Sequence, residues 1–86
     1  MLELGRLRAT PGALAIIYQD DIRLALARHI FGDWGDVCEE DRKANDSAMN
    51  NDERILSVYR TRDGVTFWVI TEWDRSITTV LLPDEY

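Results

Sequence analysis

The sequence contains one cysteine, one histidine and two prolines, and these scarcities restrict its chemistry. The single Cys38 cannot form an internal disulfide, which fits a reducing cytoplasm. Cys38 and His29 are too few to supply the four ligands of a structural zinc site. No apolar run approaches the roughly 18 residues that a membrane-spanning helix needs. The N-terminus lacks the basic and apolar regions of a signal peptide. We therefore expect a cytoplasmic protein without a membrane segment.

Motifs that mark cofactor or nucleotide chemistry are also missing. The chain has no glycine-rich phosphate loop and no pair of carboxylates at a recognisable catalytic spacing. We therefore expect no bound metal and no cofactor. The length of 86 residues and the 45% hydrophobic content predict one folded domain over residues 1–86.

The region from Arg54 to Pro83 contains three segments rich in β-branched and aromatic residues. Asp63-Gly64 separates the first two and favours a two-residue hairpin turn, because glycine accepts a positive φ. Residues 72–76 separate the second from the third and supply polar side chains that can bond the local backbone. The pattern predicts an antiparallel three-stranded meander with the middle segment as its central strand.

The first half of the chain favours helices. Thr10 and Pro11 form a helix start, because threonine caps free N–H groups and proline suits the first helical position. Asp36 predicts the start of a further helix. The predicted helical segments are residues 13–18, 22–30 and 37–49. Residues 2–8 could add a fourth strand, which Gly5 disfavours. The order predicts an α+β domain, with two or three N-terminal helices packed on one face of a three- to four-stranded antiparallel sheet.

The net charge of −6 is concentrated in one segment. Residues 33–53 hold eight acidic residues against Arg42 and Lys43, which accounts for the whole imbalance. Such a segment either keeps a solvated helix soluble or attracts a partner with a basic surface. A second polar group lies in the break between the last two predicted strands. The candidate partner-binding residues are Asp33, Trp34, Asp36, Glu39, Glu40, Asp41, Glu72, Asp74 and Arg75.

The order of residues along the chain resembles that of a known group of bacterial proteins. The residues that carry the resemblance are Gly5, Ala9-Thr10-Pro11-Gly12-Ala13-Leu14, Arg28-His29, Gly32-Asp33-Trp34-Gly35, Glu40-Asp41-Arg42, Asn45, Arg54-Ile55-Leu56-Ser57, Tyr59, Trp68, Ile70-Thr71-Glu72, Asp74-Arg75-Ser76, Thr78-Thr79, Leu81-Leu82-Pro83 and Glu85-Tyr86. The group comprises small proteins of plasmids, prophages and integrated elements, called plasmid-related proteins or type I restriction endonuclease subunit M. The resemblance implies a compact cytoplasmic domain of a mobile element, with no established activity and no established functional residues.

The restriction-subunit name does not fit the chemistry of a DNA methyltransferase. That enzyme needs a doubly wound sheet for its cofactor and an Asn- or Asp-Pro-Pro-aromatic motif at the target amine. Pro11 and Pro83 are isolated, and the chain is too short for such a sheet. At most, the protein could be an accessory to such a system.

Two other functions remain as alternatives. A small enzyme could use Glu72, Asp74 and Arg75, with His29 as a general base. The structural interpretation is that Arg75 pairs with Glu72 or Asp74, and that His29 bonds the last carbonyls of a helix.

Weak nucleic-acid binding through arginines of the sheet is the other alternative. The acidic net charge opposes it, and core packing explains the three tryptophans better. The arginines concerned are Arg54, Arg60, Arg62 and Arg75. A free edge strand leaves self-association open as well. The sequence favours a small acidic protein-interaction module of a mobile element, acting as an accessory or inhibitor of a host defence or DNA-handling complex.

Overall fold

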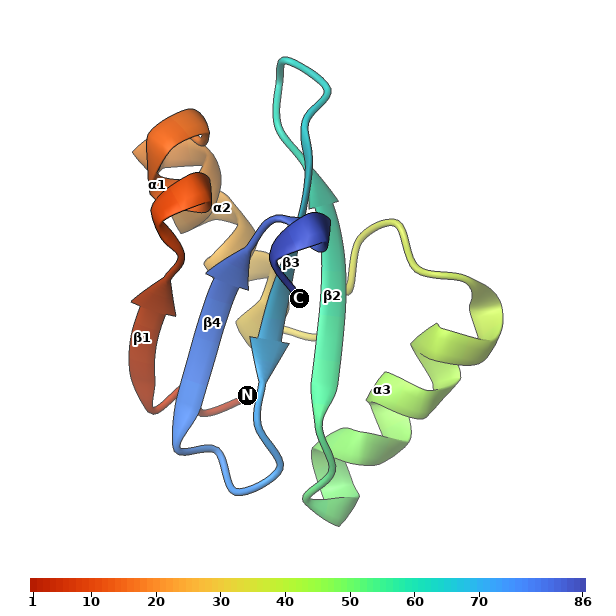
Figure 1. Cartoon of the computed structure of the whole chain (residues 1–86). Helices are drawn as coiled ribbons and strands as arrows, with labels where there is room; N and C mark the ends of the chain where they lie inside the picture. Colours follow the sequence, from red (N-terminus) through yellow and green to blue (C-terminus); the bar gives the residue numbers. More distant parts are fainter.

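Four strands form one mixed sheet in the order β1-β4-β3-β2 (Figure 1), in a computed structural model that describes residues 1–86. The strands β2 (Ile55–Arg60), β3 (Thr66–Thr71) and β4 (Ile77–Leu81) pair antiparallel, which confirms the predicted meander. The strand β1 (Arg6–Ala9) pairs with β4 in parallel. The prediction of a purely antiparallel sheet is therefore wrong at the fourth strand. Three helices and two strands separate β1 from β4, and parallel pairing requires a long connection of this kind.

The helices begin close to the predicted positions. Helix α1 (Pro11–Ile16) starts after Thr10, whose hydroxyl accepts a hydrogen bond from the Ala13 amide at 3.2 Å. Helix α2 (Gln19–Ile30) follows after a short break, and a 3₁₀ turn, η1 (Pro83–Glu85), follows β4. No helix is both long and apolar enough to cross a membrane.

Helix α3 (Glu39–Asn51) starts later than predicted, and Asp36 does not cap it. The amide of Asp36 instead donates to the Val58 carbonyl at 2.7 Å, and the Val58 amide donates to the Trp34 carbonyl at 3.0 Å. This parallel bridge holds the backbone around Gly35 against the outer side of β2. The bridge holds Asp36 ahead of the helix, and Cys38 takes the capping position without a side-chain bond.

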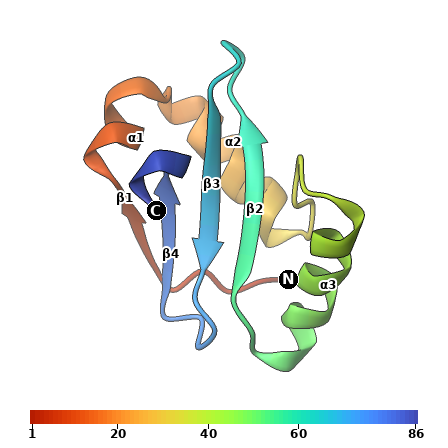
Figure 2. The ribbon, with the colours of Figure 1, turned by 45° about the vertical axis from the view of Figure 1, so that its right-hand side comes forward.

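The two faces of the sheet are covered differently. Helices α1 and α2 cover one face, and α3 lies beside β2 at the sheet edge (Figure 2). Side chains that alternate along the strands enter the covered face and pack against Ala13, Ile17 and Ala25. These strand residues are Tyr59, Phe67, Val69 and Val80. The opposite face carries only η1, so half-buried side chains such as Val58 and Trp68 remain partly accessible there.

The turn between β2 and β3 has three residues rather than the predicted two. The Thr61 amide donates to the Val65 carbonyl at 2.9 Å, and the Thr61 hydroxyl accepts from the Val65 amide at 3.0 Å. Among the turn residues only Gly64 has a positive φ, of 83°. Strand pairing ends at Thr61 and Val65, so the turn consists of residues 62–64. Asp63 therefore does not need the positive φ that a two-residue turn would require.

Candidate functional site

Most of the predicted acidic residues are neutralised by arginines of the same chain. Asp33 accepts two hydrogen bonds from the Arg28 guanidinium, at 2.8 and 3.2 Å, and these bonds lower the pKa of its carboxyl. Asp36 forms an ion pair with Arg60, with 3.7 Å between the charged atoms. On α3 the guanidinium of Arg42 hydrogen-bonds to Glu39, which lowers the pKa of that carboxyl.

Glu40 and Asp41 differ from these residues because neither forms an ion pair within the chain. Both are exposed in the first turn of α3. Asp41 also borders a groove of about 190 Å³ between α3 and β2, which Asn45 and Leu56 line as well. Among the acidic residues predicted to bind a partner between residues 33 and 41, only Glu40 and Asp41 lack an ion pair. Asp52 and Glu53, at the far end of the acidic segment, form none either.

Trp34 does not present its side chain to a partner, contrary to the prediction. It is 2% exposed and packs in a second core cluster with Leu2, Ala48 and Ile55. Its indole Nε1 donates to Asp46 at 2.8 Å. Trp34 therefore joins α3 to the sheet and acts as a core residue.

The residues Glu72, Asp74 and Arg75 do not converge. Glu72 forms an ion pair with Arg54 at 3.5 Å. The carboxylate of Asp74 accepts from the amide and hydroxyl of Ser76, at 3.1 and 2.6 Å, which lowers the pKa of Asp74. Among the three, only Arg75 borders a groove. Nothing in this arrangement brings an acid, a base and an anion-binding cation to one reacting atom.

Arg75 fastens the end of α3 to the β3–β4 turn. Its guanidinium donates to the carbonyls of Glu53 at 2.6 Å, Ala48 at 2.7 Å and Glu72 at 3.2 Å. The sequence predicted pairing with a carboxylate instead. The Ala48 carbonyl lies near the C-terminus of α3, where the helix dipole favours a positive charge. The turn itself places Arg75 at a φ of 61°.

Replacing Arg75 with methionine should lower the free energy of unfolding by about 2 kcal/mol, because three carbonyls lose hydrogen bonds from a charged donor. Urea denaturation measures this change. Arg60→Met is the control, since Arg60 forms only an exposed ion pair and its loss should cost less than about 0.5 kcal/mol. Equal effects of the two substitutions would contradict the fastening role.

His29 belongs to a chain of buried hydrogen bonds. Its Nδ1 lies 2.6 Å from the Ser57 hydroxyl, and its Nε2 lies 2.8 Å from the Thr71 hydroxyl. The Thr71 hydroxyl lies 2.8 Å from that of Thr78, which donates to the Leu4 carbonyl at 2.8 Å. A hydroxyl has one proton, so Thr71 donates to Thr78 and His29 Nε2–H donates to Thr71. Nδ1 then accepts from Ser57, which fixes the tautomer.

The environment of His29 suits a structural role. The ring is fully buried, and burial together with the positive charge of Arg75 lowers its pKa to about 4. Both ring nitrogens are occupied by hydroxyls of the core, so no solvent-borne substrate reaches them. The prediction that the His29 side chain bonds helix carbonyls is wrong, because its ring bonds Ser57 on β2 and Thr71 on β3. Thr71 and Thr78 extend this chain of bonds to β4 and the Leu4 carbonyl.

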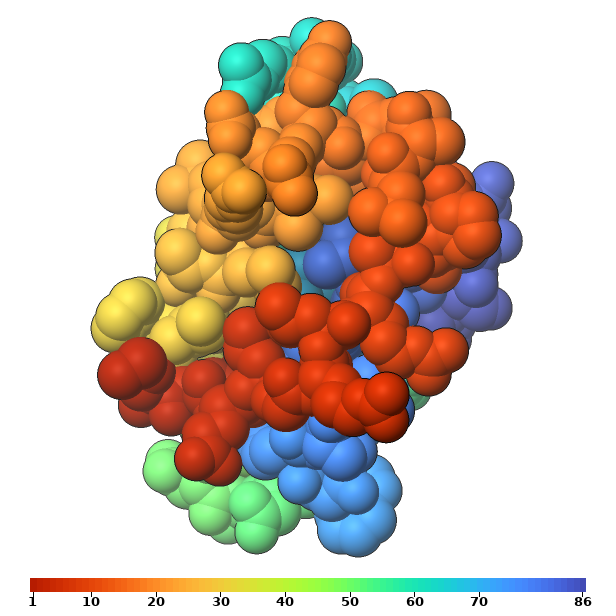
Figure 3. Space-filling view, turned by 90° about the vertical axis from the view of Figure 1, so that its left-hand side faces the viewer, coloured from red at the N-terminus to blue at the C-terminus, as the bar shows by residue number.

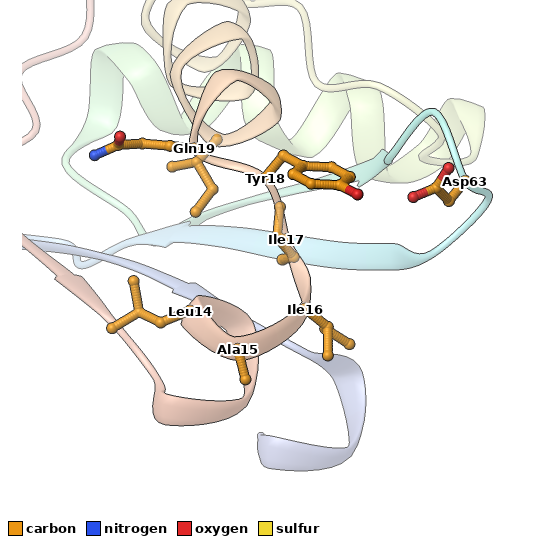
Figure 4. Close-up of a pocket in the computed structure, with 8 residues that line it drawn as sticks. Leu14, Ala15, Ile16, Ile17, Tyr18, Gln19 and Asp63 are labelled. Atoms are coloured by element: carbon orange, nitrogen blue, oxygen red, sulfur yellow. The ribbon is translucent and has the colours of Figure 1, made fainter.

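An apolar groove between α1 and α2 was not identified from the sequence. Its volume is about 480 Å³, and Leu14, Ile16 and Tyr18 line it while remaining mostly exposed (Figure 4). Asp63, from the β2–β3 turn, supplies a carboxylate at its rim. The signal in the sequence was the uninterrupted apolar run over residues 13–18, because a six-residue helix cannot bury all of its sides.

The four arginines considered for nucleic-acid binding have separate tasks. Arg54 pairs with Glu72 and donates to the Tyr86 hydroxyl, and Arg60 pairs with Asp36. Arg62 pairs with Asp21 on α2, whereas Arg75 binds backbone carbonyls. They do not form one continuous basic surface.

Searches against protein-family models, curated proteins and solved structures find no match to this chain.

Proposed function

We propose that this protein is a small interaction module that binds a protein partner with a basic surface. The observation that carries the proposal is the pair Glu40 and Asp41, which are exposed on α3 and form no ion pair within the chain. The neighbouring candidates Asp33, Asp36 and Glu39 each form an ion pair with an arginine. Burying a basic group of the partner against Glu40 and Asp41 would supply the missing counter-charge.

The rest of the surface supports a protein as the partner. Leu14, Ile16 and Tyr18 expose large apolar side chains beside the groove of Figure 4, and such patches are common where proteins bind proteins. The net charge of −6 opposes binding to nucleic acid.

The resemblance to plasmid and prophage proteins supports a more specific role in the cytoplasm of a bacterium. A basic partner surface in such a setting is the DNA-binding groove of a defence or DNA-handling complex. An acidic module that occupies this groove would act as an accessory or an inhibitor of the complex. The proposal therefore predicts that DNA and the module compete for the same surface of the partner.

Reversing the charge of Glu40 and Asp41 should weaken partner binding. Wild-type protein and the Glu40→Lys/Asp41→Lys variant are used to capture partners from a bacterial lysate, and the recovered partner is then purified. We expect the variant to bind it at least about ten-fold more weakly, a loss of about 1.4 kcal/mol. Added salt should weaken the wild-type complex more than the variant complex.

The matched control is Asp20→Lys/Asp84→Lys, which changes the net charge equally at exposed sites on α2 and η1. This control should retain the partner. If the reversed α3 variant binds the partner as tightly as the control does, the basic-surface proposal fails. Displacement of the module by duplex DNA tests the competition separately.

A further inference from the structure

Strand β1 leaves the outer side of the sheet unpaired. The amides of Arg6 and Thr10 donate to the carbonyls of Ser76 and Val80 in the β4 segment, at 2.9 and 3.0 Å. Successive residues of a strand turn their amides to opposite sides, so Leu7 and Ala9 direct N–H and C=O groups outward. Figure 3 looks onto this side of the molecule, and the red N-terminal segment and the orange α1 lie on the near surface. The other edge of the sheet is closed, because the segment around Gly35 bridges β2.

The side chains of β1 differ between the two faces of the strand. Arg6 and Arg8 are exposed, lie on the open face of the sheet and have no ion-pair partner in the chain. Leu7 points to the helix-covered face yet is 58% exposed. Leu14, on the helix that follows β1, is 64% exposed. An unpaired backbone edge therefore runs between a basic stripe and an apolar one.

We propose that β1 accepts an extended segment of a partner protein, in which acidic and apolar residues alternate. The segment adds a fifth strand through its main chain, pairing with the outward groups of Leu7 and Ala9. Its acidic side chains face Arg6 and Arg8, and its apolar side chains cover Leu7. This surface lies at the opposite end of the sheet from α3 (Figure 1), so it is distinct from the surface of the proposed function.

The basic stripe disfavours a second copy of the chain as the occupant. An antiparallel copy centred on Leu7 would set Arg6 opposite Arg8 of the other copy, and one centred on Arg8 would set two Arg8 side chains together. Like charges directly opposite one another destabilise strand pairs. Nucleic acid could neutralise the arginines, but its sugar-phosphate backbone carries no alternating N–H and C=O groups to pair with those of β1.

The test uses a fluorescent peptide of three Glu-Val repeats and measures its binding by fluorescence anisotropy. We expect a dissociation constant below about 1 mM, and at least about ten-fold weaker binding of the matching Lys-Val peptide. The Arg6→Glu/Arg8→Glu variant should reverse this preference. A Glu-Val peptide whose pairing amides are methylated should lose binding, because it retains the side chains but cannot form the ladder.

Leu7→Pro tests the edge from the protein side. It removes an amide that points outward, so the pairing with β4 is retained while the peptide loses its partner. Leu7→Ala is the control and should keep most of the binding. The proposal is overturned if the Glu-Val peptide does not bind, or if its binding is unchanged by methylation of the peptide or by Leu7→Pro. It is also overturned if light scattering shows a dimer of the protein that Leu7→Pro dissociates. Binding of single-stranded DNA that depends on Arg6 and Arg8 would also overturn it.

Discussion

Replacing Gly35 with alanine is expected to lower the free energy of unfolding by more than about 3 kcal/mol, a large part of the stability of so small a domain. Gly35 has a φ of 76°, and a Cβ atom there would lie 2.0 Å from the Val58 carbonyl oxygen and 2.8 Å from the Tyr59 ring. The obstructing oxygen belongs to the backbone of β2, which is held in the sheet by its pairing with β3. The clash is therefore relieved only by breaking the bridge between residues 34–36 and β2.

Gly64→Ala is the matched control for this substitution. Gly64 has a φ of 83°, close to that of Gly35, but its Cβ would meet nothing within 4 Å. Alanine there should cost about 1–2 kcal/mol, the penalty of a left-handed backbone alone. Urea denaturation of both variants separates the steric cost from the conformational cost. Similar losses for the two variants would show that the bridge at Gly35 contributes little.

The parts of the fold that local sequence patterns determine could be predicted, and those that depend on distant contacts could not. The meander follows from alternating side chains and local turns, so residues 54–83 were sufficient to predict it. The direction of β1 depends on how the chain returns after three helices, and no local pattern encodes that path. Asp36 looked like a helix cap because its sequence neighbours suit one. Its amide is instead taken by Val58, which lies far away in the sequence.

The candidate site was predictable to a similar extent. The exposure of Glu40 and Asp41 follows from a polar helix, which the sequence shows directly. Pairing of Asp33 and Asp36 with Arg28 and Arg60 depends on tertiary contacts, so the sequence overestimated the free acidic charge. Arg75 was assigned a carboxylate partner because Glu72 and Asp74 are its neighbours. Its position at the end of α3 could not be predicted, since tertiary contacts place α3: the Trp34 core and the bonds of Asn45 to Leu56.

The His29 network gives the second large effect, a loss of stability in mildly acidic solution. His29 has a pKa of about 4 in the folded protein, against an ordinary value of 6.5. The folded state thus favours the neutral ring. The resulting stability is fully present above pH 6.5 and is lost as the pH falls towards 4, by about 3 kcal/mol in total.

This window is separate from that of the carboxylates. Hydrogen bonds from Arg28, Ser76 and Thr10 lower the pKa values of Asp33, Asp74 and Glu85 below 3.8 or 4.5, their ordinary values. The stability that these groups contribute is lost only as the pH falls below those values. A decline between pH 6.5 and pH 4.5 is therefore attributable to His29, which is the only histidine.

His29→Gln is the variant that tests this assignment. Glutamine is neutral and can both donate and accept hydrogen bonds, but it does not titrate. We expect the variant to be less stable than the wild type at pH 7, and its urea midpoint to stay constant between pH 6.5 and pH 4.5. In the wild type, NMR should show the single imidazole titrating near pH 4. An imidazole that titrates near 6.5 would contradict this assignment, because burial and the positive charge of Arg75 disfavour the charged ring.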